Sequence, residues 1–123
     1  MPGGVVLALV AVASALLFAW GANRLIRRRA ERVPIDLTGI EGRIVFFSDA
    51  ACRRCDAARE RLAASGVAFE EVRYGDDPVR FRATGTPAVP LVVVRDADGA
   101  EVGRIAGEVR AGELKAMLEK AGL

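Results

Sequence analysis

Two cysteines, Cys52 and Cys55, are the residues of this sequence best suited to covalent chemistry. They flank Arg53 and Arg54 within the stretch FFSDAACRRCDAARERLAASG. Their spacing is compatible with a redox couple, with half of a metal site, or with two small core residues. The chain of 123 residues has no histidine, which excludes a histidine-containing catalytic triad and a His-ligated metal site.

The composition from Cys52 to Ala64 predicts a helix that begins at the cysteines, directly after a short apolar strand over 43–47. The unpaired N–H groups at a helix start favour a thiolate at Cys52, and Cys55 follows one turn later on the same face. We therefore predict that Cys52 is the nucleophile and Cys55 the resolving thiol. Arg53 and Arg54 are expected to lower the pKa of the Cys52 thiol, which would make the couple more oxidising. Alternatively, the two arginines are ordinary solvent-exposed residues.

A metal function remains an alternative for the same two sulfurs. Two thiolates provide half of a tetrahedral ligand set, and the sequence offers no other cysteine. We predict no metal site within one chain, although a thiolate metal or iron–sulfur carrier could combine the pairs of two chains. A non-catalytic docking module that has kept its cysteines is the other alternative.

The N-terminal segment 3–22 contains no charged residue. About 20 apolar residues at ~1.5 Å per residue cover a ~30 Å hydrocarbon core, so this segment predicts a transmembrane helix. A cleaved signal peptide fits less well, because no basic residue precedes the apolar run and Trp20-Gly21-Ala22 is a poor cleavage site. Trp20 suits an interfacial aromatic position.

A basic flank and tether is expected over 23–42. The flank carries five arginines, and positively charged flanks remain in the cytoplasm: Arg24, Arg27, Arg28, Arg29 and Arg32. We therefore expect a single-pass membrane protein whose remaining chain faces the cytoplasm. From Val33 onward there are 13 basic and 15 acidic residues, which gives no basic excess that would suggest nucleic acid binding.

The remaining segment, 43–123, predicts one small α/β domain with the order β-α-β-α-β-β-α. A strand is expected over 67–74, a short helix opens at Asp77-Pro78, and a hairpin turn over 96–99 joins two further strands. Apolar residues at helical spacing predict a C-terminal helix packed on the core: Leu114, Met117, Leu118 and Ala121. A soft-metal carrier would instead have the order β-α-β-β-α-β.

Three stretches of this domain resemble the thioredoxin-like superfamily, with a length most similar to a glutaredoxin. They are FFSDAACRRC, SGVAFEEVRYGDDP and AVPLVVVRDADGAEVGRIAG. The resemblance implies a thioredoxin-like fold and thiol–disulfide oxidoreductase activity on protein or small-molecule disulfides. It also implies that Val89-Pro90 has a cis peptide bond and contributes to substrate binding, with Pro87 as a competing candidate.

Other family features are only partly present. The motif between the cysteines is Arg-Arg, and the segment corresponding to the glutathione-binding Gly-Gly of glutaredoxins is Ala106-Gly107-Glu108. Glutathione is therefore one candidate electron donor, and no cofactor is expected. The resemblance as a whole predicts a membrane-anchored, monomeric glutaredoxin-like enzyme.

Overall fold

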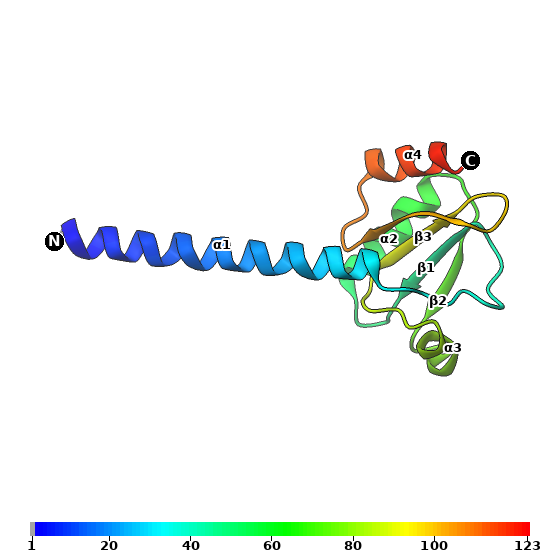
Figure 1. The fold of residues 1–123 in the computed structure, drawn as a ribbon, viewed down its shortest axis with the longest axis horizontal. Coiled ribbons are helices and arrows are strands. Elements are labelled where there is room, and N and C mark those ends of the chain that lie inside the picture. Colours follow the sequence, from blue (N-terminus) through cyan, green and yellow to red (C-terminus); the bar gives the residue numbers. More distant parts are fainter. Residues whose placement is uncertain (1) are drawn as a thin grey trace.

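The computed structural model describes residues 2–123, without the side chain of Pro2. A long N-terminal helix, α1 (Pro2–Arg32), precedes a small α/β domain (Figure 1). The domain contains β1 (Ile44–Ser48), α2 (Arg53–Ala64), β2 (Glu70–Arg73), α3 (Pro78–Ala83), β3 (Leu91–Arg95), β4 (Glu101–Ala106) and α4 (Ala111–Lys120). This is the predicted order of elements.

The four strands form one sheet in the order β2-β1-β3-β4. β1 pairs with β2 in parallel, whereas the β1–β3 and β3–β4 pairs are antiparallel. The parallel pair requires the crossover that α2 provides, and the antiparallel pair β3–β4 closes through the turn after Arg95. The second strand is shorter than the expected 67–74, because only four residues pair with β1.

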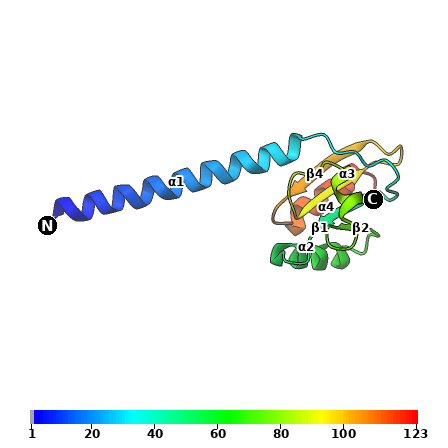
Figure 2. The ribbon, with the colours of Figure 1, turned by 90° about the horizontal axis from the view of Figure 1, so that it is seen from below.

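The central strands are buried on both faces of the sheet, so their side chains alternate between two cores. Ile44 and Phe46 of β1 enter the first core, which α2 and α4 cover. Val45 and Phe47 enter the second core, where the α3 residue Phe81 packs. Figures 1 and 2 show these helices on opposite sides of the sheet. The continuous apolar strands in the sequence reflect this two-sided burial.

The second core is also covered by residues that precede the domain. α1 does not end with its apolar part but continues through the basic flank to Arg32. Ala30, near its end, and Ile40, in the following segment, are both about 95 % buried in the second core. Ile35 and Leu37 pack against the same core. Because α3 has only six residues, this segment provides much of the cover on this face.

α1 is long and apolar enough to cross a membrane, with a mean hydropathy of 2.4 over its most apolar window and no part of that window buried. Apolar side chains in its first part are exposed: Leu7, Leu16, Leu17 and Phe18 are each more than 60 % exposed. By length and composition, a signal sequence would look the same.

Candidate active site

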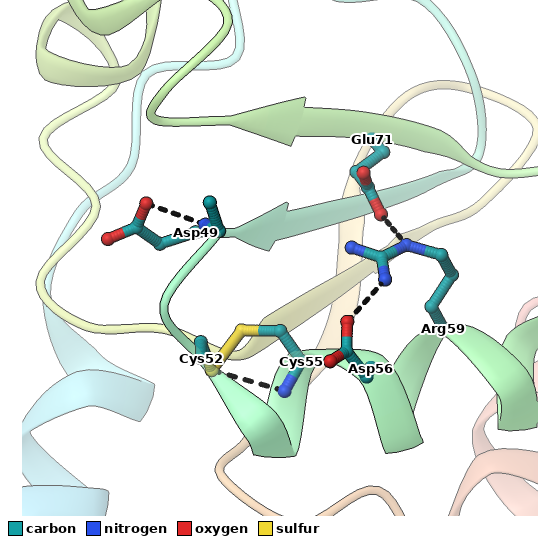
Figure 3. Close-up of a disulfide and its surroundings, with 7 residues drawn as sticks. Asp49, Cys52, Cys55, Asp56, Arg59 and Glu71 are labelled. Atoms are coloured by element: carbon teal, nitrogen blue, oxygen red, sulfur yellow. Dashed lines mark hydrogen bonds and ion pairs between the residues drawn. A yellow bond between two sulfur atoms is a disulfide. The ribbon is translucent and has the colours of Figure 1, made fainter.

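The two cysteines lie at the start of α2, at the end of a loop that leaves the carboxyl end of β1 (Figure 3). Asp49 shapes this loop: its carboxylate accepts the Ala50 N–H at 2.7 Å, and its carbonyl accepts the Cys52 N–H at 3.3 Å. Cys52 is the N-cap residue of α2. It occupies the position at which an unpaired helix N–H is available to a side chain.

Cys52 and Cys55 form a disulfide, with their Cα atoms 5.2 Å apart. The Cys52 Sγ accepts a hydrogen bond from the Cys55 N–H at 3.1 Å. Cys52 is half-buried, whereas Cys55 is completely buried in the first core together with Ala58 and Leu62. An incoming thiol can therefore reach the Cys52 sulfur, while Cys55 is accessible mainly to Cys52.

Arg53 and Arg54 are exposed on the first turn of α2. Neither residue takes part in an ion pair among residues 2–123. Their charges thus lie close to Cys52 in sequence but are well solvated, which weakens any effect on the thiol.

Arg59, which was not among the predicted site residues, lies one turn beyond Cys55 on α2. Its guanidinium donates to Asp56 at 2.8 Å, one turn earlier, and to Glu71 of β2 at 2.6 Å, and it lies 5.8 Å from the centroid of the Phe46 ring. The hydrogen bond with Glu71, followed by that with Asp56, raises the pKa of Arg59. Arg59 therefore stays cationic and links the redox helix to the sheet (Figure 3). The i,i+3 spacing to Asp56 was visible in the sequence, but the pairing with Glu71 required the fold.

The Val89–Pro90 peptide bond is cis, as the resemblance implied, and no other cis bond occurs among the described residues. Pro90 is buried immediately before β3, and its carbonyl accepts the Gly107 N–H at 3.0 Å. Val89 packs against the same core as Cys52 and Cys55. Pro87, the competing candidate, is exposed.

Comparison with known proteins identifies the fold. None of the protein-family models and none of the curated proteins compared with the chain matches it. Among solved structures, the glutaredoxin Grx-1 of Archaeoglobus fulgidus is 21 % identical, with a TM-score of 0.51 over 67 % of this chain and 90 % of its own. Thioredoxin 1 of Thermosipho africanus is 20 % identical, with a TM-score of 0.50 over 63 % of this chain and 90 % of its own. The domain has the thioredoxin-like fold.

A thioredoxin-like fold that carries a C-x-x-C disulfide at the start of its first domain helix supports thiol–disulfide oxidoreductase chemistry. A thio-disulfide isomerase of Thermus thermophilus also shares the fold, with 19 % identity and a TM-score of 0.50 over 69 % of this chain and 82 % of its own. Within residues 2–123, no group of three or more His, Cys, Asp or Glu side chains could hold a metal ion.

A hollow of about 570 Å³ lies beside the redox helix. It is bounded by Trp20 and Arg27 of α1, by Arg54 of α2, and by Gly107 and Arg110 of the loop between β4 and α4. The loop between β4 and α4 therefore faces α1. No sequence pattern predicted this contact, because α1 is remote from both other elements along the chain.

Proposed function

We propose that this protein is a membrane-anchored thiol–disulfide oxidoreductase that uses Cys52 as the nucleophile and Cys55 as the resolving thiol. The observation that carries the proposal is the asymmetry of the pair. Cys52 is partly exposed and its sulfur accepts a backbone N–H at the helix start, whereas Cys55 is completely buried. The backbone N–H would stabilise the Cys52 thiolate in the reduced state.

In the reductive direction, the Cys52 thiolate attacks a substrate disulfide, one S–S bond breaks, and the first substrate thiolate leaves. The Cys55 thiolate then attacks the Cys52 sulfur of the mixed disulfide and releases the second substrate thiolate. The dithiol gives up two electrons and two protons, and the substrate becomes a dithiol. A thiol donor, for which glutathione is a candidate, must then reduce the Cys52–Cys55 disulfide. Val89 and Pro90 border the substrate groove in this proposal, and Arg53 and Arg54 tune the thiolate.

The membrane context is part of the proposal. Segment 3–22 spans the bilayer, the arginines of 23–32 hold the carboxyl end of α1 in the cytoplasm, and a monomeric domain of residues 43–123 acts there. A charge-free helix followed by five arginines supports this arrangement.

The mechanism is tested with the full chain in detergent, by reduction of a model protein disulfide with dithiothreitol as the electron source. Cys52→Ser should abolish the activity. Cys55→Ser, reduced and then freed of dithiothreitol before the substrate is added, should accumulate a mixed disulfide on Cys52. Ala51→Ser is the matched control, since it places a hydroxyl on the exposed neighbouring residue and should retain activity. Full activity of Cys52→Ser would disprove the mechanism. The mechanism would also be disproved if the anaerobically purified protein contained bound metal and its two thiols did not react near neutral pH.

The side of the membrane is a separate question with its own measurement. A membrane-impermeant thiol reagent should leave the reduced Cys52 of intact cells unlabelled and should label it after lysis. Labelling in intact cells would place the domain outside.

A further inference from the structure

The segment between α1 and the domain is bound to the domain rather than free. Arg104 of β4, whose side chain is only 8 % exposed, donates to the carbonyl of Ala30 at 3.2 Å and to that of Val33. These two carbonyls lie at the end of α1, where main-chain acceptors lack helical partners. The buried guanidinium therefore holds the helix end against the sheet.

The rest of the segment is held in the same way. Arg95 of β3 donates to the carbonyl of Ile40 at 2.7 Å and to that of Gly42. The Asp36 N–H donates to the Thr84 carbonyl at 2.9 Å. With these bonds and the burial of Ala30 and Ile40, α1 and the domain form one packed unit. The direction of α1 thus determines the orientation of the domain.

The dithiol end of the domain faces along α1 toward its apolar part. In Figures 1 and 2, α2 begins on the side of the domain from which α1 extends, and the turn between β3 and β4 lies at the far side. The hollow between α1 and α2 reaches from Arg54, next to Cys55, as far as Trp20. At ~1.5 Å per residue, Trp20 and Arg27 are about 10 Å apart along the helix, which is comparable with a headgroup layer.

The residues that line this hollow are mainly positively charged, as contact with an anionic headgroup layer requires. Arg27, Arg54, Arg61 and Arg110 line it, with Glu108 as the acidic residue among them. The Arg27 Nε atom is buried and has no hydrogen-bond partner within the described residues. A cationic wall next to an interfacial tryptophan fits the anionic headgroups of a membrane surface.

From this geometry we infer that the Cys52–Cys55 pair acts on disulfides that membrane-inserted proteins carry at the headgroup layer of the same leaflet. The inference rests on the proposed function and adds a substrate class to it. The exchange is the one given above: two electrons and two protons pass from the dithiol to the substrate disulfide. A rigid anchor holds the half-buried residue Cys52 at one depth, so substrates at that depth have a high effective concentration.

The orientation is tested independently of activity, with one fluorescent label in the full chain. In a Cys52→Ser/Cys55→Ser background, the label is placed at Ala57→Cys, beside the hollow, or at Asp98→Cys, in the turn between β3 and β4. The protein is reconstituted in vesicles of phosphatidylcholine and phosphatidylglycerol that contain headgroup nitroxide lipids. We expect strong quenching at position 57 and weak quenching at position 98. Equal, weak quenching at both positions would overturn the orientation.

The substrate class is tested with two single-span peptides that carry the same disulfide. One carries it at the headgroup layer, and the other carries it on a helical spacer about 30 Å farther out. The full chain should reduce the first peptide about tenfold faster than the second. The segment 30–42, which its buried side chains and the hydrogen bonds from Arg95 and Arg104 hold on the domain, is called the docked segment. A flexible Gly-Ser linker of about ten residues between Ala22 and Asn23 leaves the docked segment intact and should remove this preference.

A soluble disulfide separates the two proposals. Both the native chain and the linker variant should reduce it at the same rate. Loss of this reaction in the native chain would refute the proposed oxidoreductase function. Normal reduction of the soluble disulfide without a preference between the peptides would refute only the membrane substrate class.

Discussion

The arginines between the cysteines provide a quantitative test of how the thiolate is stabilised. The perturbation is the double substitution Arg53→Gln/Arg54→Gln, which removes two charges and keeps good helix formers. Because both side chains are exposed and unpaired in the described part of the chain, each charge is expected to contribute about 0.2–1 kcal/mol. Removing both charges should therefore destabilise the Cys52 thiolate by about 0.4–2 kcal/mol and raise the pKa of this thiol in the double variant.

The backbone should contribute more than the arginines. The Cys55 N–H lies 3.1 Å from the Cys52 sulfur, and a hydrogen bond to a charged group is worth about 1.5–3 kcal/mol. We therefore expect the double variant to retain a Cys52 pKa below the ordinary thiol range. Its reduction potential should fall by roughly 10–40 mV, since ~30 mV corresponds to ~1.4 kcal/mol in a two-electron couple.

The assay is the rate of alkylation of the reduced full chain by iodoacetamide as a function of pH, in an uncharged detergent. Arg61→Gln is the control: it removes an exposed charge of the same helix, about two and a half turns beyond Cys52, and should leave the pH midpoint unchanged. The shift caused by the double substitution should shrink at high salt, because exposed charges are screened. An unchanged midpoint in the double variant, or an equal shift in the control, would refute the tuning role.

Three further predictions concern the docked segment. Ile40→Ala should lower the free energy of unfolding of the domain by about 2–4 kcal/mol, because it leaves a cavity in the second core. Val79→Ala, at an exposed position, should have little effect. Thermal unfolding of both variants in detergent tests this difference. Arg104→Gln should increase hydrogen exchange and proteolysis at the end of α1, since it removes the buried donor to two carbonyls there; unchanged protection would show that apolar packing alone holds the segment. Hydrogen bonds from the Thr38 hydroxyl and backbone N–H lower the pKa of Asp36. The Asp36 carboxylate therefore stabilises the fold above about pH 4, and this stabilisation is lost as the pH falls through the pKa of the folded state. Thr38→Val should move the titration midpoint of the Asp36 carboxyl, measured by NMR, back toward its ordinary value.

Much of the domain could be predicted because its signals are local. Continuous apolar runs such as Leu91–Val94 are typical of strands buried on both faces, and the structure confirms that burial. Asp77 before Pro78 predicted a helix start, and the Asp77 carboxylate accepts the Arg80 N–H at 3.0 Å. The first-turn position of the cysteines followed from the composition after Ala51 in the same way.

The docked segment could not be predicted, because nothing local distinguishes it from a flexible tether. Ile35, Leu37 and Ile40 have neither the period of a helix nor that of a strand, and Pro and Gly lie among them. They pack on the same core as Phe81 of the six-residue α3, and this core exists only in the assembled fold. The role of Arg104 is hidden for the same reason: in the sequence it is one polar residue of a strand, and its acceptors lie more than 70 positions earlier.

The burial of Ala30 and Ile40 also limits how the domain can be released from its anchor. A protease that cut the chain between Ile40 and Arg43 would remove side chains that cover Val45, Phe47 and Val93. The shed product would expose an apolar sheet face and would be prone to aggregation. A cut before Asn23 would instead leave the complete core and yield a stable fragment that keeps all five arginines. The same stretch of about a dozen residues thus connects the domain to α1 and completes the core of the domain. Proteolysis within this stretch would therefore yield an unstable domain rather than a soluble form of the protein.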